Sequence, residues 1–250
     1  MTSLNSLEHK KVIFFDMNRT LLDPQQAFRD SFLETLQEYT GRWQGNEDFA
    51  ADKVLETYLE QWKKQRRSKG KTASPLEQIR RNCLTHAFQS IPIPNKERFL
   101  RTFWQQTQAK QDQSPCLYPD VRETLEQLHE KSYKLAIISN GSKLKQEQQL
   151  KHLNLQALIP DQHLFSSQQG GLRKPNPQLF RHALQTLRIP ATQAVMVGDS
   201  WNNDIVGATN AGMDAIWIRP LHTNKQSSQR KLGSRQVMLI RHFSQLNQLL

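Results

Sequence analysis

The residues best suited to chemistry begin with Asp16, which directly follows the apolar run VIFF at 12–15. A carboxylate at the end of a buried strand can attack a phosphorus atom and can also hold a divalent cation. An aspartate in this position is also a common turn or cap residue. Asp16 by itself is therefore compatible with both interpretations, and the other polar stretches have to decide between them.

Two further stretches have side chains that could bind a phosphoryl group. Ser139, Asn140 and Gly141 end the apolar run LAIIS at 135–139 or follow it directly. A hydroxyl and the N–H groups of a turn can hold a phosphoryl oxygen, and glycine permits a close approach of the backbone. Lys174, in GGLRKPNP, could neutralise a carboxylate nucleophile and the charge that develops on phosphorus, with Arg173 as the competing cation.

The fourth stretch, GDSWNND at 198–204, is the most specific of the four. Asp199 ends an apolar run and Asp204 lies five residues later, in the first turn of the helix expected there. Both carboxylates could face one cation. In the alternative interpretation, Asp199 or Ser200 caps the helix and Asp204 interacts favourably with its dipole.

The sequence predicts that alternating strands and helices position these residues. Short apolar runs at 12–15, 135–139, 194–199 and 215–218 predict strands covered on both faces. From residue 116 onward helical patterns alternate with these runs, and Asp120 is the expected N-cap of the helix that precedes 135–139. Strands that alternate with helices predict an α/β fold with a parallel sheet. In such a sheet the carboxyl ends of the strands lie at one edge, near the point where strand order reverses.

Residues 25–111 are different, because they contain helical apolar stripes and no convincing strand. The stripes are Phe28/Phe32/Leu36/Tyr39, Val54/Leu55/Tyr58/Leu59/Trp62, Leu76/Ile79/Cys83/Ala87 and Phe99/Leu100/Phe103/Trp104. Pro24 marks the entry to this lobe, and the polar stretch 105–115 is expected to lead out of it. The first strand must pair with strands more than a hundred residues later, so we predict a core of residues 1–23 and 112–250 with an inserted helical cap at 24–111.

Composition narrows the class of protein. With 36% hydrophobic residues and no apolar run long enough for a membrane span, the chain reads as a globular protein without a membrane partner. No signal-peptide pattern precedes the first strand, which predicts a cytoplasmic location. The two cysteines, Cys83 and Cys116, suggest neither a disulfide framework nor a zinc site.

Two basic clusters contribute to the net charge of +11, and such clusters can form a nucleic-acid-binding surface. Six of the nine residues from Lys63 to Lys71 are basic, and a looser cluster spans 219–235. Aromatic side chains are not interleaved with them, and no nucleic-acid-binding motif is present, so the pattern does not favour nucleic acid as a partner. A small, phosphorylated, anionic substrate accounts for the charge with fewer assumptions.

Taken together, FFDMNRTLL, SNG, LRKPNP and VGDSWNND closely resemble the four motifs of the haloacid dehalogenase superfamily. The resemblance covers residues 12–23 and 117–218. It implies a doubly wound α/β core, and a helical insertion after the first motif resembles that superfamily's first type of cap. Most members are magnesium-dependent phosphatases, so the resemblance implies Mg²⁺ as the cofactor. Substrate identity and oligomeric state are left open.

The resemblance also implies roles for individual residues. Asp16 would be the nucleophile, and Lys174 would balance its charge. The implied Mg²⁺ ligands are Asp16, the backbone carbonyl of Asn18, Asp199 and Asp204. The implied phosphoryl-binding residues are Thr20, Ser139, Asn140, Gly141 and Lys174.

The departure from the family pattern is Asn18, where the phosphatases carry an aspartate that protonates the leaving oxygen and then activates water. A carboxamide cannot accept that proton, and loss of a positioned acid/base costs roughly 10²- to 10⁴-fold in rate. His86 and Glu77 in the cap are conceivable substitutes, and substrates with good leaving groups, such as acyl phosphates, would suffer least.

Three functions therefore remain open. The first is a phosphatase with slow turnover or an easy leaving group. The second is a 2-haloacid dehalogenase-like hydrolase, which also lacks the second carboxylate, although dehalogenases need no magnesium and their fourth motif typically starts with Ser-Asn. The third is a degenerate module that binds a phosphorylated ligand or a protein without catalysis.

Overall fold

A computed structural model describes Leu7 and residues 9–40, 50–67, 75–91, 93, 96–167, 171–219 and 229–250. The chain divides into two compact units, one of Met1–Pro24 with Pro115–Leu250 and one of Gln25–Ser114. The predicted boundaries lie within three residues of these. No helix in the described ranges is long and apolar enough to cross a membrane.

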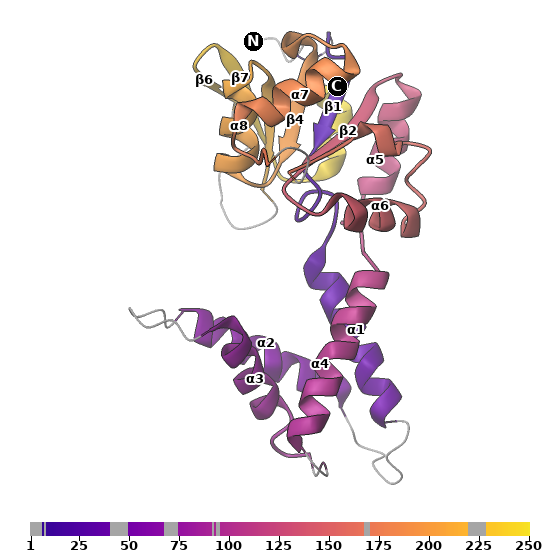
Figure 1. The fold of residues 1–250 in the computed structure, drawn as a ribbon, viewed down its shortest axis with the longest axis vertical. Helices are drawn as coiled ribbons and strands as arrows, with labels where there is room; N and C mark the ends of the chain where they lie inside the picture. Colours follow the sequence, from indigo (N-terminus) through magenta and orange to yellow (C-terminus); the bar gives the residue numbers. More distant parts are fainter. Residues whose placement is uncertain are drawn as a thin grey trace. The chain divides into compact units, whose positions relative to one another are not determined.

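The first unit contains a seven-stranded sheet in the order β3-β2-β1-β4-β5-β7-β6 (Figure 1). All described pairings are parallel except the one between β6 and β7. The strands are β1 (Val12–Phe15), β2 (Lys134–Ser139), β3 (Leu164–Ser166), β4 (Ala194–Gly198), β5 (Asp214–Ile218), β6 (Gln229–Leu232) and β7 (Arg235–Ile240). Because β2 and β4 flank β1, the order of the parallel strands reverses between β1 and β4.

Helices cover both faces of this sheet, which is the doubly wound α/β fold that was predicted. The helices are α5 (Val121–Glu130), α6 (Lys143–His152), α7 (Pro177–Leu187), α8 (Gly207–Asn210) and α9 (Leu246–Leu249). Ile13 and Phe15 of β1 lie in one apolar cluster with side chains of α5, α6 and α9. Val12 and Phe14 lie in another with α7 and α8. Two buried faces explain why VIFF is apolar throughout.

The second unit is built from α1 (Pro24–Thr40), α2 (Ala51–Arg67), α3 (Leu76–Ala87) and α4 (Lys96–Gln113) (Figure 1). Its core is aromatic: the ring of Phe32 is fully buried and lies 4.9 Å from that of Phe103 between centroids. The four predicted stripes lie on these four helices. The residues of these stripes are buried or partly buried, except Leu76, which is half exposed at the start of α3.

The structure adds local detail to the predictions. Residues 105–113 lead out of the helical unit, as expected, and do so as the continuation of α4. Asp120 is the N-cap residue of α5, as expected, but it has a left-handed backbone (φ 63°) and its side chain makes no capping hydrogen bond. The short strands β3, β6 and β7 were missed. The basic cluster at Lys63–Lys71 lies only partly within the described residues, as does the cluster at 219–235.

Candidate active site

Asp16 and Asp199 lie at the point where the strand order reverses. Asp16 follows β1 and Asp199 follows β4, and the Asp16 N–H donates to the Val197 carbonyl over 2.9 Å. The parallel register of β1 and β4 therefore brings the two carboxylates to the same edge of the sheet. Asp16 is only 8% exposed.

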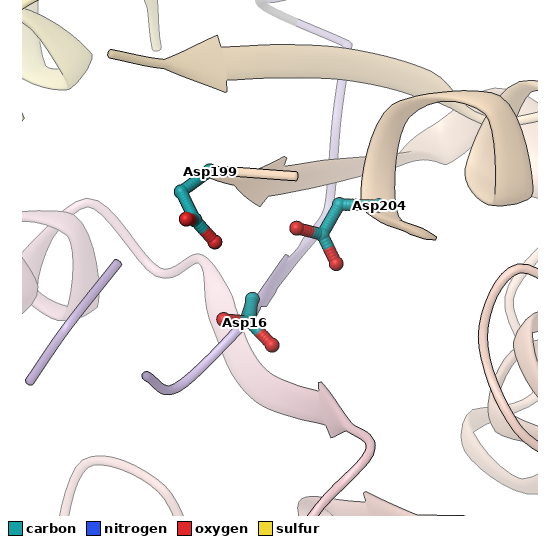
Figure 2. Close-up of side chains that lie close together, drawn as sticks. All are labelled: Asp16, Asp199 and Asp204. Carbon is teal, nitrogen blue, oxygen red and sulfur yellow. The ribbon is translucent and has the colours of Figure 1, made fainter. Parts of the chain in front are cut away.

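Asp204 completes a cluster of three carboxylates. One oxygen of each of Asp16, Asp199 and Asp204 lies within 4.8 Å of the others, and Figure 2 shows the three side chains converging. Hard divalent cations prefer several oxygen ligands around one point, at roughly 2.0–2.6 Å. The donor set and its spacing therefore fit a magnesium ion held by these three residues.

A π-helix at Trp201–Val206 brings Asp204 back toward the sheet. Asp204 is 1% exposed, and its Oδ2 accepts a hydrogen bond of 2.9 Å from the Ser200 N–H. A Cβ on Gly198 would overlap the Asp204 carboxylate, so glycine is needed there. Ser200 does cap the helix, as its hydroxyl accepts from the Asn203 N–H. Capping and a metal-type carboxylate cluster thus coexist in one stretch.

Lys174 is the buried cation of the site. Its Nζ donates to Asp16 Oδ1 and Asp204 Oδ1, both at 2.6 Å, and to the Ile138 carbonyl at 2.8 Å. Its side chain is 2% exposed, whereas Arg173 is exposed. Of the two candidate cations, the structure therefore places Lys174 against Asp16.

Asn140 holds the backbone of Lys174 in place. Its Oδ1 accepts from the Lys174 N–H at 2.7 Å, and its Nδ2 donates to the Lys174 carbonyl at 3.0 Å. The side-chain amide of Asn140 is thus engaged by the loop that carries Lys174 and positions that residue. The substrate-binding role expected of Asn140 stays a prediction, for its backbone N–H.

Ser139 has a partner that the sequence did not reveal. Gln146, on α6 and 2% exposed, donates from Nε2 to Ser139 Oγ over 2.7 Å. Gly141 permits this contact, because a Cβ there would overlap the Gln146 amide. Since the Ser139 hydroxyl accepts from Gln146, its own proton is free to point toward a ligand.

The loop after β1 contains Asn18, Arg19 and Thr20. Asn18 is exposed and forms an isolated bridge with Leu22, so its backbone is fixed while its side chain faces solvent. Thr20 is fully buried and its Oγ1 has no hydrogen-bond partner among the described residues. The cap candidates His86 and Glu77 both lie exposed on α3.

Arg19 is a second residue that sequence reasoning missed. Its Nε lies 3.5 Å from Asp199 Oδ2, and its side chain is 69% exposed. Its backbone has φ 65°, a conformation that costs a residue with a side chain roughly 1 kcal/mol or more. A cation held in a strained turn beside a potential metal ligand is a functional signal. The sequence clue was an arginine inside the first motif.

The electrostatics of the cluster follow from burial. Burial raises the pKa of Asp199 to about 6; Arg19 opposes this rise, and Asp16 and Asp204 add to it. Burial also raises the pKa of Asp204, against the pull of Lys174. Burial alone would lower the pKa of Lys174, but Asp16 and Asp204 outweigh it and hold that pKa above its usual value. Lys174 is therefore charged, and the carboxylates gain by binding a further cation.

Comparison with known proteins agrees with this geometry. Residues 13–218 match the model of the family described as haloacid dehalogenase-like hydrolase. A glyceraldehyde 3-phosphate phosphatase from Methanothermobacter thermautotrophicus is 35% identical over 53% of this chain and 58% of the relative. An N-acylneuraminate-9-phosphatase from Mus musculus is 26% identical over 85% of this chain and 84% of the relative.

Solved structures extend the likeness to the fold. A crystal structure of a dehalogenase aligns with a TM-score of 0.59 and 21% identity, over 96% of this chain and 97% of the other. The chain spans between 41% and 58% of the length of the first four curated relatives that it matches.

The contact between Gly141 and Gln146 gives a prediction for stability. Gly141→Ala should destabilise the fold by about 1–3 kcal/mol, because the new methyl group displaces the Gln146 amide from Ser139. In Gly141→Ala/Gln146→Ala the clash is gone, so the loss should be smaller than the sum of the single losses. Denaturant unfolding of the four proteins measures this coupling, and simple additivity would contradict it.

The raised pKa of Asp199 gives a prediction for pH. Between about pH 4 and pH 6 the folded protein holds a proton on Asp199 that the unfolded chain releases. This carboxyl therefore stabilises the fold fully below about pH 4, and that contribution is lost as pH rises through about 6. In EDTA, the wild type should lose more Tm between pH 4.5 and 7 than Asp199→Asn, which has no proton to lose.

The matched control for this pH experiment is Glu56→Gln, an exposed position on α2. It should follow the wild type across the same range. If Asp199→Asn showed the same pH dependence as the wild type, the carboxyl of Asp199 would not be the titrating group.

Proposed function

Because the chain belongs to the haloacid dehalogenase-like hydrolase family, we propose that it is a magnesium-dependent phosphatase that acts on a small phosphorylated metabolite through an aspartyl-phosphate at Asp16. The observation that carries this proposal is the convergence of Asp16, Asp199 and Asp204 around a point next to the buried Lys174. The phosphatase names of the relatives support the same reaction class.

The charge balance of the site supports a divalent cation. Asp16, Asp199 and Asp204 carry three negative charges when ionised, against one on Lys174 and one on Arg19, which is itself mostly exposed. Mg²⁺ would be held by the three carboxylates and the backbone carbonyl of Asn18, and when bound it supplies positive charge to the phosphoryl oxygens. The exposed Asn18 side chain takes no part in that ligand set.

The protein residues divide the chemistry between them. Asp16 attacks phosphorus as the bond to the leaving oxygen breaks, which produces an acyl phosphate; a water molecule then attacks phosphorus and restores the carboxylate. Lys174 holds Asp16 in position and offsets its charge. Ser139, oriented by Gln146, donates its hydroxyl proton to a phosphoryl oxygen, together with the N–H groups of the following turn.

Asn18 sets the speed of this reaction. Its carboxamide has no proton to give to the leaving oxygen and cannot take one from the attacking water, so both steps rely on solvent. Substrates whose leaving group needs no proton, such as acyl or aryl phosphates, are therefore favoured. Asp199 and Asp204 argue against a dehalogenase, which needs no cation, and the retained Asp16 and Lys174 argue against a module without catalysis.

The reaction assay follows from the position of Asn18. Asn18→Asp should raise phosphate release from a poor leaving group, such as a sugar phosphate, by roughly 10²- to 10⁴-fold. The gain on an aryl phosphate should be much smaller, because its leaving oxygen needs little help. Released phosphate is measured with magnesium over a panel of phosphorylated sugars, nucleotides, acyl phosphates and an aryl phosphate.

Two controls make this assay decisive. Asp16→Asn should abolish phosphate release, and unchanged release would indicate a contaminating phosphatase. Asn18→Ala should show no gain, since it restores no acid. No release from any substrate, with no gain in Asn18→Asp, would refute the phosphatase proposal; chloride release from 2-chloropropionate without metal would favour a dehalogenase. A ligand-dependent thermal shift without turnover would favour a binding module.

A further inference from the structure

The helical unit contains a cavity of about 790 Å³ between α3 and α4 that plays no part in the chemistry described so far. Its lining from α3 repeats at helical spacing and so presents one face: Glu77, Arg80, Arg81 and Leu84. Its lining from α4 is Glu97, Arg98, Leu100, Arg101, Trp104, Gln105 and Gln108. All of these residues belong to the unit Gln25–Ser114.

The charge of this groove is predominantly positive. Four guanidinium groups face two carboxylates, and one pair, Arg81 Nη2 with Glu97 Oε1 at 3.0 Å, spans from α3 to α4 with both side chains largely exposed. Arg98 and Arg101 have no ion-pair partner among the residues that the structure describes. They are neighbours at a spacing of three on one helix, where like charges repel. An anion between them would remove that cost.

The lining of the groove also includes apolar residues. Leu84 and Leu100 are buried beneath it, and Arg80 lies with its Cζ 4.5 Å from the centre of the ring of Trp104, which is only partly buried. The lining thus combines guanidinium groups, which bind oxyanions in pairs of hydrogen bonds, with apolar surface for a ligand body.

We propose that the α3–α4 groove is a binding site for a small organic polyanion that carries phosphate or carboxylate groups. The volume suits a metabolite, because drug-sized ligand pockets span roughly 300–1,000 Å³. Arg98 and Arg101 hold its oxyanion groups, and the partly buried Trp104 ring beside Arg80 accommodates its body. This proposal does not depend on the phosphatase reaction, because no residue of the groove belongs to the Asp16 site.

The experiment is calorimetric titration of the full chain with tripolyphosphate, citrate and ATP, in EDTA so that no metal bridges anions to the Asp16 site. The wild type should bind at least one of them with a Kd below about 1 mM at physiological salt. Arg98→Ala and Arg101→Ala should each weaken that binding about tenfold, the usual effect of removing one charged hydrogen-bond partner. Comparison of the three probes separates phosphate from carboxylate preference.

Two matched variants fix the location of binding. Arg67→Ala removes an exposed arginine of α2 in the same unit, within the basic cluster Lys63–Lys71, and should leave the Kd within about twofold. Ser139→Ala changes the Asp16 site and should leave it unchanged as well. Circular dichroism of each variant checks that the helices remain, and Arg101→Lys, which keeps the charge, should retain part of the affinity.

Several outcomes would overturn the proposal. The first is a Kd above about 1 mM for all three probes. The second is binding that Arg67→Ala weakens as much as Arg101→Ala does. The third is binding that Ser139→Ala removes. Binding of a 12-nucleotide single strand that depends on Arg98 and Arg101, with no binding of the small anions, would instead make the groove a nucleic-acid contact.

Discussion

The ammonium group of Lys174 is the constraint on which the rest of the site depends. It lies 2.6 Å from both Asp16 and Asp204 and is almost fully buried, so it is the positive charge that compensates these two buried carboxylates. Several elements position Lys174 together. The residues after β1, the end of β2 and the π-helix each supply a contact to its ammonium group, and the loop before α7 carries its backbone. Loss of this cation would leave buried negative charge uncompensated, so the site and the fold around it are energetically coupled.

For the proposed reaction, Asn18 and Arg19 would shift the site from proton transfer toward charge compensation. The position that carries an acid/base in the related phosphatases has a carboxamide, and the next residue places a guanidinium 3.5 Å from Asp199. That guanidinium would compete with a metal ion for the same carboxylate. It is also mostly exposed and so is free to move aside when a cation binds. The strain of its left-handed backbone is retained, which is expected where geometry serves function more than stability.

The main elements could be predicted from sequence because their signals are local. Apolar runs identified β1, β2, β4 and β5, and the rule that ligands gather at carboxyl ends of parallel strands then grouped Asp16, Ser139 and Asp199 correctly. Gln146 could not be found this way, since a buried glutamine on α6 has no local signature and its role depends on tertiary contact with Ser139. β3 has only three residues, β6 (QRKL) is a short, mostly polar edge strand, and β7 (RQVMLI) begins with two polar residues, so none of them shows the long apolar run of the central strands.

The location of the positive charge also changes the interpretation of the net charge of +11. From the sequence, we expected this charge to attract an anionic substrate. At the carboxyl ends of the strands, however, three carboxylates lie beside only Lys174 and Arg19, so this part of the protein is itself negative without a metal ion. In the proposed reaction, attraction of an anion to Asp16 would therefore come from a bound cation, while guanidinium groups elsewhere contribute to the long-range field. A field from exposed arginines is screened within about 10 Å at 0.1 M salt. Association with anions should accordingly depend on salt more steeply than the chemical step, whose charges are buried.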